Sequence, residues 1–156
     1  MNRDDPYFTL LPEAVATVRA ETKLAILEQL AARFAAVYDL DRTNVLERIE
    51  ERERLGSTGF GRGFAIPHAH IEGLNRPVAA FLRLESAVDF EAVDSMPVDL
   101  VFGLLSPETA GASHLHALAA ISRAVRDDRM HEALVRAPHA EALYGLLCNV
   151  DDRDAA

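Results

Sequence analysis

Cysteine is almost absent from this sequence, since Cys148 is the only one among 156 residues. A single thiol cannot form an internal disulfide, and it excludes the zinc sites that small domains build from paired cysteines. Chains with so little cysteine are typical of a reducing compartment, so the sequence predicts a cytoplasmic protein.

An excess of basic side chains is also lacking. The chain carries 25 acidic and 16 basic residues, which gives a formal net charge of −9. An acidic domain without a basic stripe is poorly suited to the phosphate backbone of nucleic acids or to anionic lipid. We therefore predict no nucleic-acid partner, and the acidic surface favours a basic protein partner instead.

Long apolar runs are missing as well. No segment approaches the ~20 apolar residues that a membrane span needs, so we predict no membrane insertion. Residues 1–6 are polar and acidic and lack the apolar stretch of a signal peptide. With 49% hydrophobic residues in this length, the sequence predicts one domain over residues 1–156. Its core covers about 10–147, between a short N-terminal lead-in over 1–12 and a polar C-terminal tail at 151–154.

The hydrophobic spacing predicts helices, then strands, then helices again. Helices are expected over 22–37, from a cap at Asp41 or Thr43 to residue 54, from a cap at Ser113 to about residue 126, and over 130–135 and 139–147. Strands are expected over 64–66, 78–84 and 98–105, the last covered on both faces. Pro67 is expected to end the first strand and direct the chain out of the sheet. This order predicts an α/β fold with helices packed on the faces of a central sheet.

A glycine-rich loop over residues 56–63 contains half of the eight glycines in the chain. Exposed N–H groups in such a loop can hold an anion. The loop lacks the Lys-Ser/Thr pair of a nucleotide P-loop, and no strand-then-helix context suggests a dinucleotide site. A tight connection between a helix and a strand is the simpler interpretation.

Four of the six histidines form two pairs, His68 with His70 and His114 with His116. His68 follows Pro67 at the end of a short apolar strand, and α/β proteins often place their sites at strand ends. A neutral imidazole is a nucleophile near pH 7, although a surface histidine in a turn is the simpler alternative. His114 is expected at a helix N-terminus, where the dipole lowers the pKa of an imidazole, and His116 is expected on another face of that helix.

Residues 52–68 read RERLGSTGFGRGFAIPH. This segment resembles the signature of the mannitol/fructose-class enzyme IIA domains of the bacterial phosphotransferase system. Segments 90–94, 97–102 and 113–118 extend the resemblance in the same order, so that it spans about residues 10–147. Among these domains the sequence is most similar to the stand-alone nitrogen-regulatory enzyme IIA.

The resemblance implies an α/β sandwich with a central mixed β-sheet flanked by helices on both faces. It implies that a histidine, here His68, accepts a phosphoryl group from the phosphocarrier protein HPr or its nitrogen-type homologue. The second active-site histidine of the family corresponds to His114, and its arginine before the glycine loop corresponds to Arg52. Nitrogen-type members regulate other proteins, which implies an unidentified protein target in nitrogen, potassium or carbon metabolism.

These residues suit the chemistry that the resemblance implies. Phosphoryl transfer needs an in-line nucleophile and hydrogen-bond donors around the equatorial oxygens. His68 is the expected nucleophile, and His114 and Arg52 are the expected donors, which makes the chain a phosphoryl carrier rather than a conventional turnover enzyme. No metal and no other cofactor is expected if the donor is itself a phosphohistidine. The N–H groups of a loop are expected to add phosphate-binding contacts, from Gly56, Ser57, Thr58 and Gly59.

Regulation of a target protein is the leading prediction, and three alternatives to it remain open. The first is a sugar-specific enzyme IIA, which passes the phosphoryl group to a IIB domain. A target-binding protein that needs no phosphate is a further alternative. A metal site is less favoured, and its ligands would be His68, His70, His114 and His116. Ala69 stands where the family usually has glycine, and His70 adds an imidazole near the acceptor.

Overall fold

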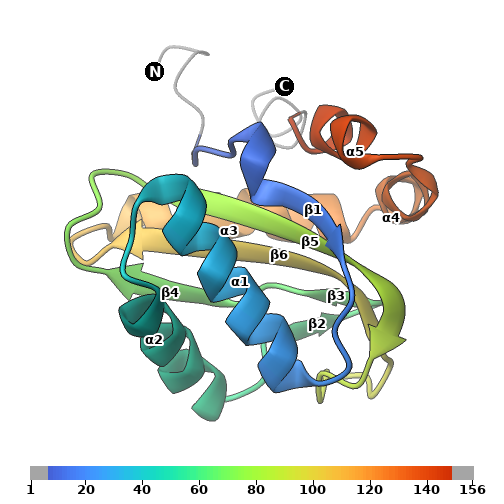
Figure 1. The fold of residues 1–156 in the computed structure, drawn as a ribbon, viewed down its shortest axis with the longest axis horizontal. Coiled ribbons are helices and arrows are strands. Elements are labelled where there is room, and N and C mark those ends of the chain that lie inside the picture. The colour runs from blue at the N-terminus through green and yellow to red at the C-terminus, as the bar shows by residue number, and fades with distance from the viewer. Residues whose placement is uncertain (1–6, 149–156) are drawn as a thin grey trace.

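A mixed six-stranded sheet crosses the middle of the protein, as the computed structural model of residues 7–148 shows (Figure 1). Its order is β1-β5-β6-β3-β2, and β4 pairs with β6 beside β3. β5 and β6 run antiparallel at the centre, whereas β1 is parallel to β5, and both β3 and β4 are parallel to β6. The strands are β1 (Val15–Val18), β2 (Gly59–Gly61), β3 (Phe64–Ala65), β4 (His68–Ile71), β5 (Val78–Val88) and β6 (Val98–Pro107).

Helices cover both faces of this sheet. α1 and α2 lie on the face that is nearer the viewer in Figure 1, and α3 lies behind the sheet. α4 and α5 pack on the same side as α3. This arrangement confirms the predicted α/β sandwich. The helices are α1 (Lys23–Tyr38), α2 (Arg42–Arg54), α3 (Ala112–Val125), α4 (Asp128–Arg136) and α5 (Ala140–Leu147), and a short 3-10 turn covers Pro12–Ala14.

Alternating side chains of β5 supply both halves of the core. Val78 and Ala80 pack against α1 and α2, while Ala79 and Phe81 pack against the opposite layer. β6 is buried on both faces from Leu100 onward. Both strands are therefore longer than the predicted 78–84 and 98–105, and the prediction that β6 is covered on both faces is confirmed.

Side-chain caps begin the first two helices, and the one predicted at Asp41 is confirmed. The Thr22 hydroxyl accepts a hydrogen bond from the Ala25 N–H, and the Asp41 carboxylate accepts one from Asn44. The predicted cap at Ser113 is wrong, because α3 begins after Gly111 and Ser113 lies inside its first turn. No side-chain hydrogen bond caps that end of α3.

The role predicted for Pro67 is right in one part and wrong in the other, because the strand before it ends at Ala65 as expected. The chain does not leave the sheet after Pro67 but continues as β4, and the Pro67 carbonyl accepts a hydrogen bond from the Leu104 N–H. Because proline cannot donate to a ladder, it stands in the short gap between β3 and β4, where its missing N–H is tolerated. β1 and β2 were not expected from the sequence either.

Two expectations concern the ends of the chain. Phe8, in the predicted lead-in, is buried against the α3 layer, whereas residues 1–6 and the tail at 151–154 lie outside the described residues. Within residues 7–148, every helix is too short or too polar to cross a membrane.

Candidate active site

A cleft of about 280 Å³ opens where the last turns of α2 pass the strand β4 and the start of α3. The sheet edge brings together three segments that are far apart in the sequence, because β4 pairs with β6 and the chain then turns directly into α3. The cleft is lined by Arg48, Glu51, Arg52, Leu55, His68, Ala69, His70 and His114.

The alternation of side chains along β4 presents two histidines to one face. His68 and His70 are half-buried, whereas Ala69 and Ile71 between and after them are buried in the α1–α2 core. In the parallel ladder, His70 lies beside Ser106 of β6. A two-residue spacing on a strand therefore places both imidazoles in the cleft.

The hydrogen bonds of His68 fix which of its nitrogens carries the proton. Nδ1 lies 2.8 Å from the Ile66 carbonyl oxygen, and Arg52 donates its Nε–H to Nε2 at 3.2 Å. A carbonyl oxygen only accepts hydrogen bonds, so Nδ1 is assigned the proton and Nε2 keeps its lone pair. The nucleophilic nitrogen of His68 consequently faces Arg52 within the cleft.

Burial keeps His68 neutral. Loss of solvent is the largest influence on its pKa, which is lowered below the usual 6.5, and the guanidinium of Arg52 and the neighbouring imidazole of His70 act in the same direction. The Ile66 carbonyl partly opposes this effect. The imidazole is therefore in its nucleophilic form throughout the neutral pH range.

His114 stands beside both histidines of β4. It is the third residue of α3, it is only 6% exposed, and its ring centroid lies 5.6 Å from that of His68 and 4.3 Å from that of His70. Its Nδ1 lies 2.6 Å from the Ser106 hydroxyl. Burial is the main influence that lowers the pKa of His114 to about 4, and the neighbouring imidazoles of His70 and His68 act in the same direction.

Arg52 spans the distance between His68 and the glycine loop. Besides its contact with His68, it donates Nη1–H to the Gly56 carbonyl oxygen at 3.0 Å. The structure thus brings together the three residues that the sequence singled out, His68, His114 and Arg52, around one cleft.

The glycine loop uses several of its N–H groups internally. Gly56 donates to the Glu53 carbonyl, Thr58 donates to the Glu53 carboxylate, and Gly59 donates to the Ser57 hydroxyl. None of these four loop residues lines the cleft in the part of the chain that the structure describes. Their phosphate-binding role stays a prediction, and the contact that the loop makes toward the site is the one from Gly56 to Arg52.

Glu53 is a structural residue that sequence reasoning missed. It is buried, pairs with Lys23 Nζ at 2.9 Å and accepts hydrogen bonds from the N–H and hydroxyl of Thr58. Helical spacing contains the signal, since Glu53 follows the buried Val45 and Ile49 at intervals of four residues. This pair anchors the loop that follows α2.

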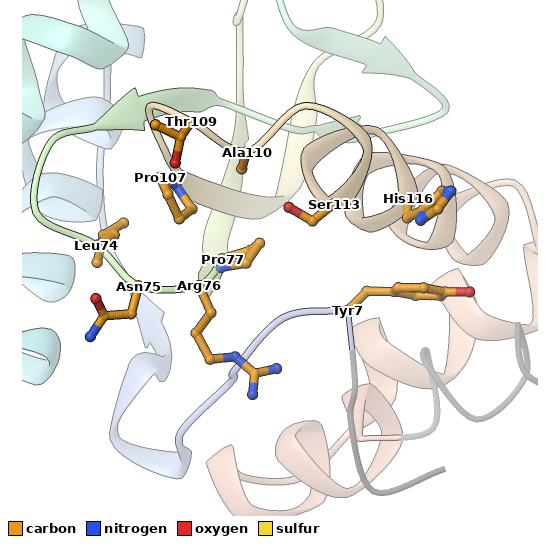
Figure 2. Close-up of a pocket in the computed structure, with 10 residues that line it drawn as sticks. All are labelled: Tyr7, Leu74, Asn75, Arg76, Pro77, Pro107, Thr109, Ala110, Ser113 and His116. Atoms are coloured by element: carbon orange, nitrogen blue, oxygen red, sulfur yellow. The ribbon is translucent and has the colours of Figure 1, made fainter. Parts of the chain in front are cut away.

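The second members of the two histidine pairs lie in different regions. His70 enters the cleft, but His116 points to another face of α3, where its ring lies 5.6 Å from that of Tyr7. His116 lines a separate groove of about 650 Å³ (Figure 2). Residues 7–148 contain no group of three or more potential ligands arranged to hold a metal ion, so the four-histidine metal site is not assembled.

The chain is similar in sequence to enzyme IIA proteins of the phosphotransferase system. Residues 10–150 match the family described as phosphoenolpyruvate-dependent sugar phosphotransferase system, EIIA 2. A nitrogen regulatory protein of Bradyrhizobium diazoefficiens is 42% identical over 137 residues, which cover 87% of this chain and 90% of that protein. A fructose-specific EIIA component of Haloferax volcanii is 36% identical, covering 70% of this chain and 71% of that protein.

The fold is also similar to that of a solved structure of a nitrogen regulatory protein. The crystal structure of nitrogen regulatory protein IIA-Ntr from Neisseria meningitidis aligns with a TM-score of 0.83 at 32% identity. The alignment covers 88% of this chain and 95% of that one.

Proposed function

Because the chain belongs to the EIIA 2 family of the phosphotransferase system, we propose that Nε2 of His68 accepts a phosphoryl group from a phosphocarrier protein. The carrier is HPr or its nitrogen-type homologue. The phosphorylated and unphosphorylated forms then regulate a target protein differently. The observation that carries the proposal is the neutral His68, whose unprotonated Nε2 faces Arg52 in the cleft.

The transfer step needs no general base, because the attacking nitrogen of His68 already has a free lone pair. The lone pair of Nε2 attacks the phosphorus of the carrier's phosphohistidine, the new N–P bond forms as the old one breaks, and the carrier's imidazole leaves with the electron pair. Nδ1 of His68 keeps its proton throughout, with the Ile66 carbonyl as its acceptor. Neither a metal nor a nucleotide is needed for this exchange between two imidazoles.

Arg52 and His114 supply the donors that such a step requires. The Arg52 Nε–H occupies the position that the phosphorus must take, so the guanidinium has to move from Nε2 onto the phosphoryl oxygens as the bond forms. A guanidinium presents several donors in a fixed plane, which suits phosphate oxygens. His114, kept neutral by burial, is the second donor.

The surface around the cleft suits a protein donor. Leu55 is 85% exposed on the cleft rim, and Leu115, next to His114, is 65% exposed. Exposed apolar side chains beside a reactive group are typical of a docking surface. The net charge of −9 favours a basic carrier and predicts that association slows as salt rises.

Regulation is favoured over sugar transport by the extent of the similarity. The nitrogen regulatory relative matches over 90% of its length, whereas the fructose-specific relative matches over 71%. A sugar-specific enzyme IIA that passes its phosphoryl group to a IIB domain is the second candidate. We expect either function in the cytoplasm, where the carrier proteins of such a system are expected to act.

The acceptor is tested by labelling with phosphoenolpyruvate, the upstream kinase and the carrier. We expect stoichiometric labelling of the wild type and none of His68→Ala, with His116→Ala as the matched histidine control that labels normally. Persistent labelling of His68→Ala would overturn the acceptor assignment. The double variant His68→Ala/His70→Ala then shows whether the neighbouring imidazole had accepted the group instead.

The choice between regulation and sugar transport is tested with the labelled protein. Purified IIB domains of the fructose and mannitol systems are added, and loss of label from this chain is followed over time. A regulatory protein retains its label, whereas rapid transfer to a IIB domain would establish the sugar-specific role.

A further inference from the structure

Ser106 occupies an unusual place beneath the cleft. It belongs to β6, it is fully buried, and its hydroxyl oxygen lies 2.6 Å from Nδ1 of His114. Its ladder partner in β4 is His70, so the two side chains lie on the same face of the sheet. The function proposed above uses His114 but leaves Ser106 without a role.

The direction of this hydrogen bond follows from burial. A buried hydroxyl needs an acceptor for its proton, and among residues 7–148 the only hydrogen-bond partner of the Ser106 hydroxyl is His114. If Nδ1 of His114 were the donor instead, the hydroxyl proton would be left without an acceptor in a buried position, which is unfavourable. Ser106 therefore donates, and Nδ1 of His114 accepts.

The hydrogen bond at Nδ1 of His114 determines whether its Nε2 carries a proton. A neutral imidazole carries one proton, and when Nδ1 accepts a hydrogen bond the proton resides on Nε2. The pKa of about 4 keeps the ring neutral at physiological pH. With Nδ1 turned to Ser106 and the ring lining the cleft, Nε2–H is the group available to a ligand there.

The ring of His70 restricts the same imidazole from another side. The ring centroids of His70 and His114 are 4.3 Å apart, at an interplanar angle of 41°. A flip of the His114 ring would break its hydrogen bond to Ser106, and the ring would have to turn against the packed ring of His70. The orientation of His114 is thus fixed by Ser106 and by the packing of His70.

We propose that Ser106 is a positioning residue for phosphoryl transfer: its hydroxyl holds His114 as the Nε2–H tautomer, which donates a hydrogen bond to a phosphoryl oxygen in the cleft. The inference rests on the proposed function of His68. It extends that function by assigning the donor atom of His114 and the residue that selects it. A neutral donor stabilises the transferred group without taking or giving a proton.

The tautomer is tested in the free protein, without a carrier or phosphate. Long-range ¹H–¹⁵N NMR of His114 is expected to show a protonated Nε2 and an unprotonated Nδ1 in the wild type. Ser106→Ala, which removes one oxygen from a buried site, is expected to shift the population toward the Nδ1–H form. Ser113→Ala, an exposed serine of the same helical turn, is the matched control and should leave the spectrum unchanged.

Kinetics supply the second readout. Ser106→Ala should lower the maximal rate of phosphoryl transfer about tenfold with little change in the KM for the carrier, less than the roughly 100-fold expected for loss of a direct donor. Ser106→Thr keeps the hydroxyl and should restore the wild-type tautomer.

Two results would overturn the inference. One is an Nδ1–H tautomer in the wild type, and the other is a Ser106→Ala variant with the wild-type spectrum and rate. A protein with the expected tautomer that never becomes phosphorylated would instead contradict the function proposed for His68, so the two failures are distinguishable.

Discussion

Two clefts flank the first turns of α3, and they differ in how their polar groups are arranged. The larger cleft, of about 650 Å³, is lined by His116 and Arg76 among others. Figure 2 shows that its polar side chains are spread along the groove, with His116 beside Tyr7 at one end and Asn75 at the other. The smaller, of about 280 Å³, includes His68 and His114.

Hydrogen bonding separates the two clefts more clearly than volume does. In the smaller cleft, Arg52 donates to His68 at 3.2 Å and Ser106 pairs with His114 at 2.6 Å. His114 and His116 are two residues apart on one helix, yet one is 6% exposed with a strongly lowered pKa and the other lies at the surface. The comparison teaches that oriented, desolvated side chains mark the candidate site, whereas the size of a groove does not.

The largest effect is expected at Arg52, with Arg76 of the larger groove as its control. Arg52→Ala should lower the rate of His68 phosphorylation on the order of 1,000-fold, because it removes the charged donor nearest to the acceptor nitrogen. Arg76→Ala, in the larger groove, should label at the wild-type rate. Rapid-quench labelling at saturating carrier measures both, and equal losses in the two variants would erase the distinction between the clefts.

The next largest effect is expected at His114, with His116 of the same helix as its control. His114→Asn should slow transfer roughly 100-fold, since it removes the proposed neutral donor. His116→Asn should stay within about twofold of the wild type, because its side chain lines the other groove. The same labelling assay applies, and a slow His116→Asn variant would indicate that the larger groove takes part in the reaction.

Stability should depend on pH through His114. Because burial lowers its pKa from 6.5 to about 4, the unfolded chain binds more protons than the folded protein between these values. The free energy of unfolding should therefore fall as pH falls, by up to about 2 kcal/mol from this group between pH 6.5 and 5.

Urea titrations at the two pH values measure this difference. His114→Asn should lose that part of the pH dependence, and His116→Asn should keep the wild-type dependence. Identical pH dependence in the wild type and His114→Asn would show that His114 is not held neutral by the fold.

The smallest effect concerns the rim of the cleft. Leu55→Asp should lower kcat/KM for the carrier about tenfold, mainly through KM, since it places a charge in the proposed docking surface. Val93 is 81% exposed and lines neither cleft, so Val93→Asp is the matched control. If both variants bind the carrier equally well, the docking surface lies elsewhere.

Much of the fold could be predicted from local patterns. The cap at Asp41 and the apolar spacing of the helices act within a few residues, so the sequence alone contains them. β4 was missed because it has four residues and follows Pro67, and only pairing with the distant β6 makes it a strand. Pairing of this kind is not visible in a local pattern.

The candidate site was predictable in part for a similar reason. The resemblance pointed to His68, His114 and Arg52, which the structure places around one cleft. The contact between Ser106 and His114 depends on how α3 returns to the sheet, and the burial of Glu53 depends on Lys23 from another helix. Neither contact has a signature in the sequence that identifies its partner.

The phosphorylated atom is determined most directly by ³¹P and ¹⁵N NMR of the protein after phosphorylation by its carrier. We expect one phosphohistidine, with the phosphorus on Nε2 of His68 and the proton retained on Nδ1. Phosphorus on Nδ1, on another histidine such as His116, or on no histidine at all would contradict this expectation.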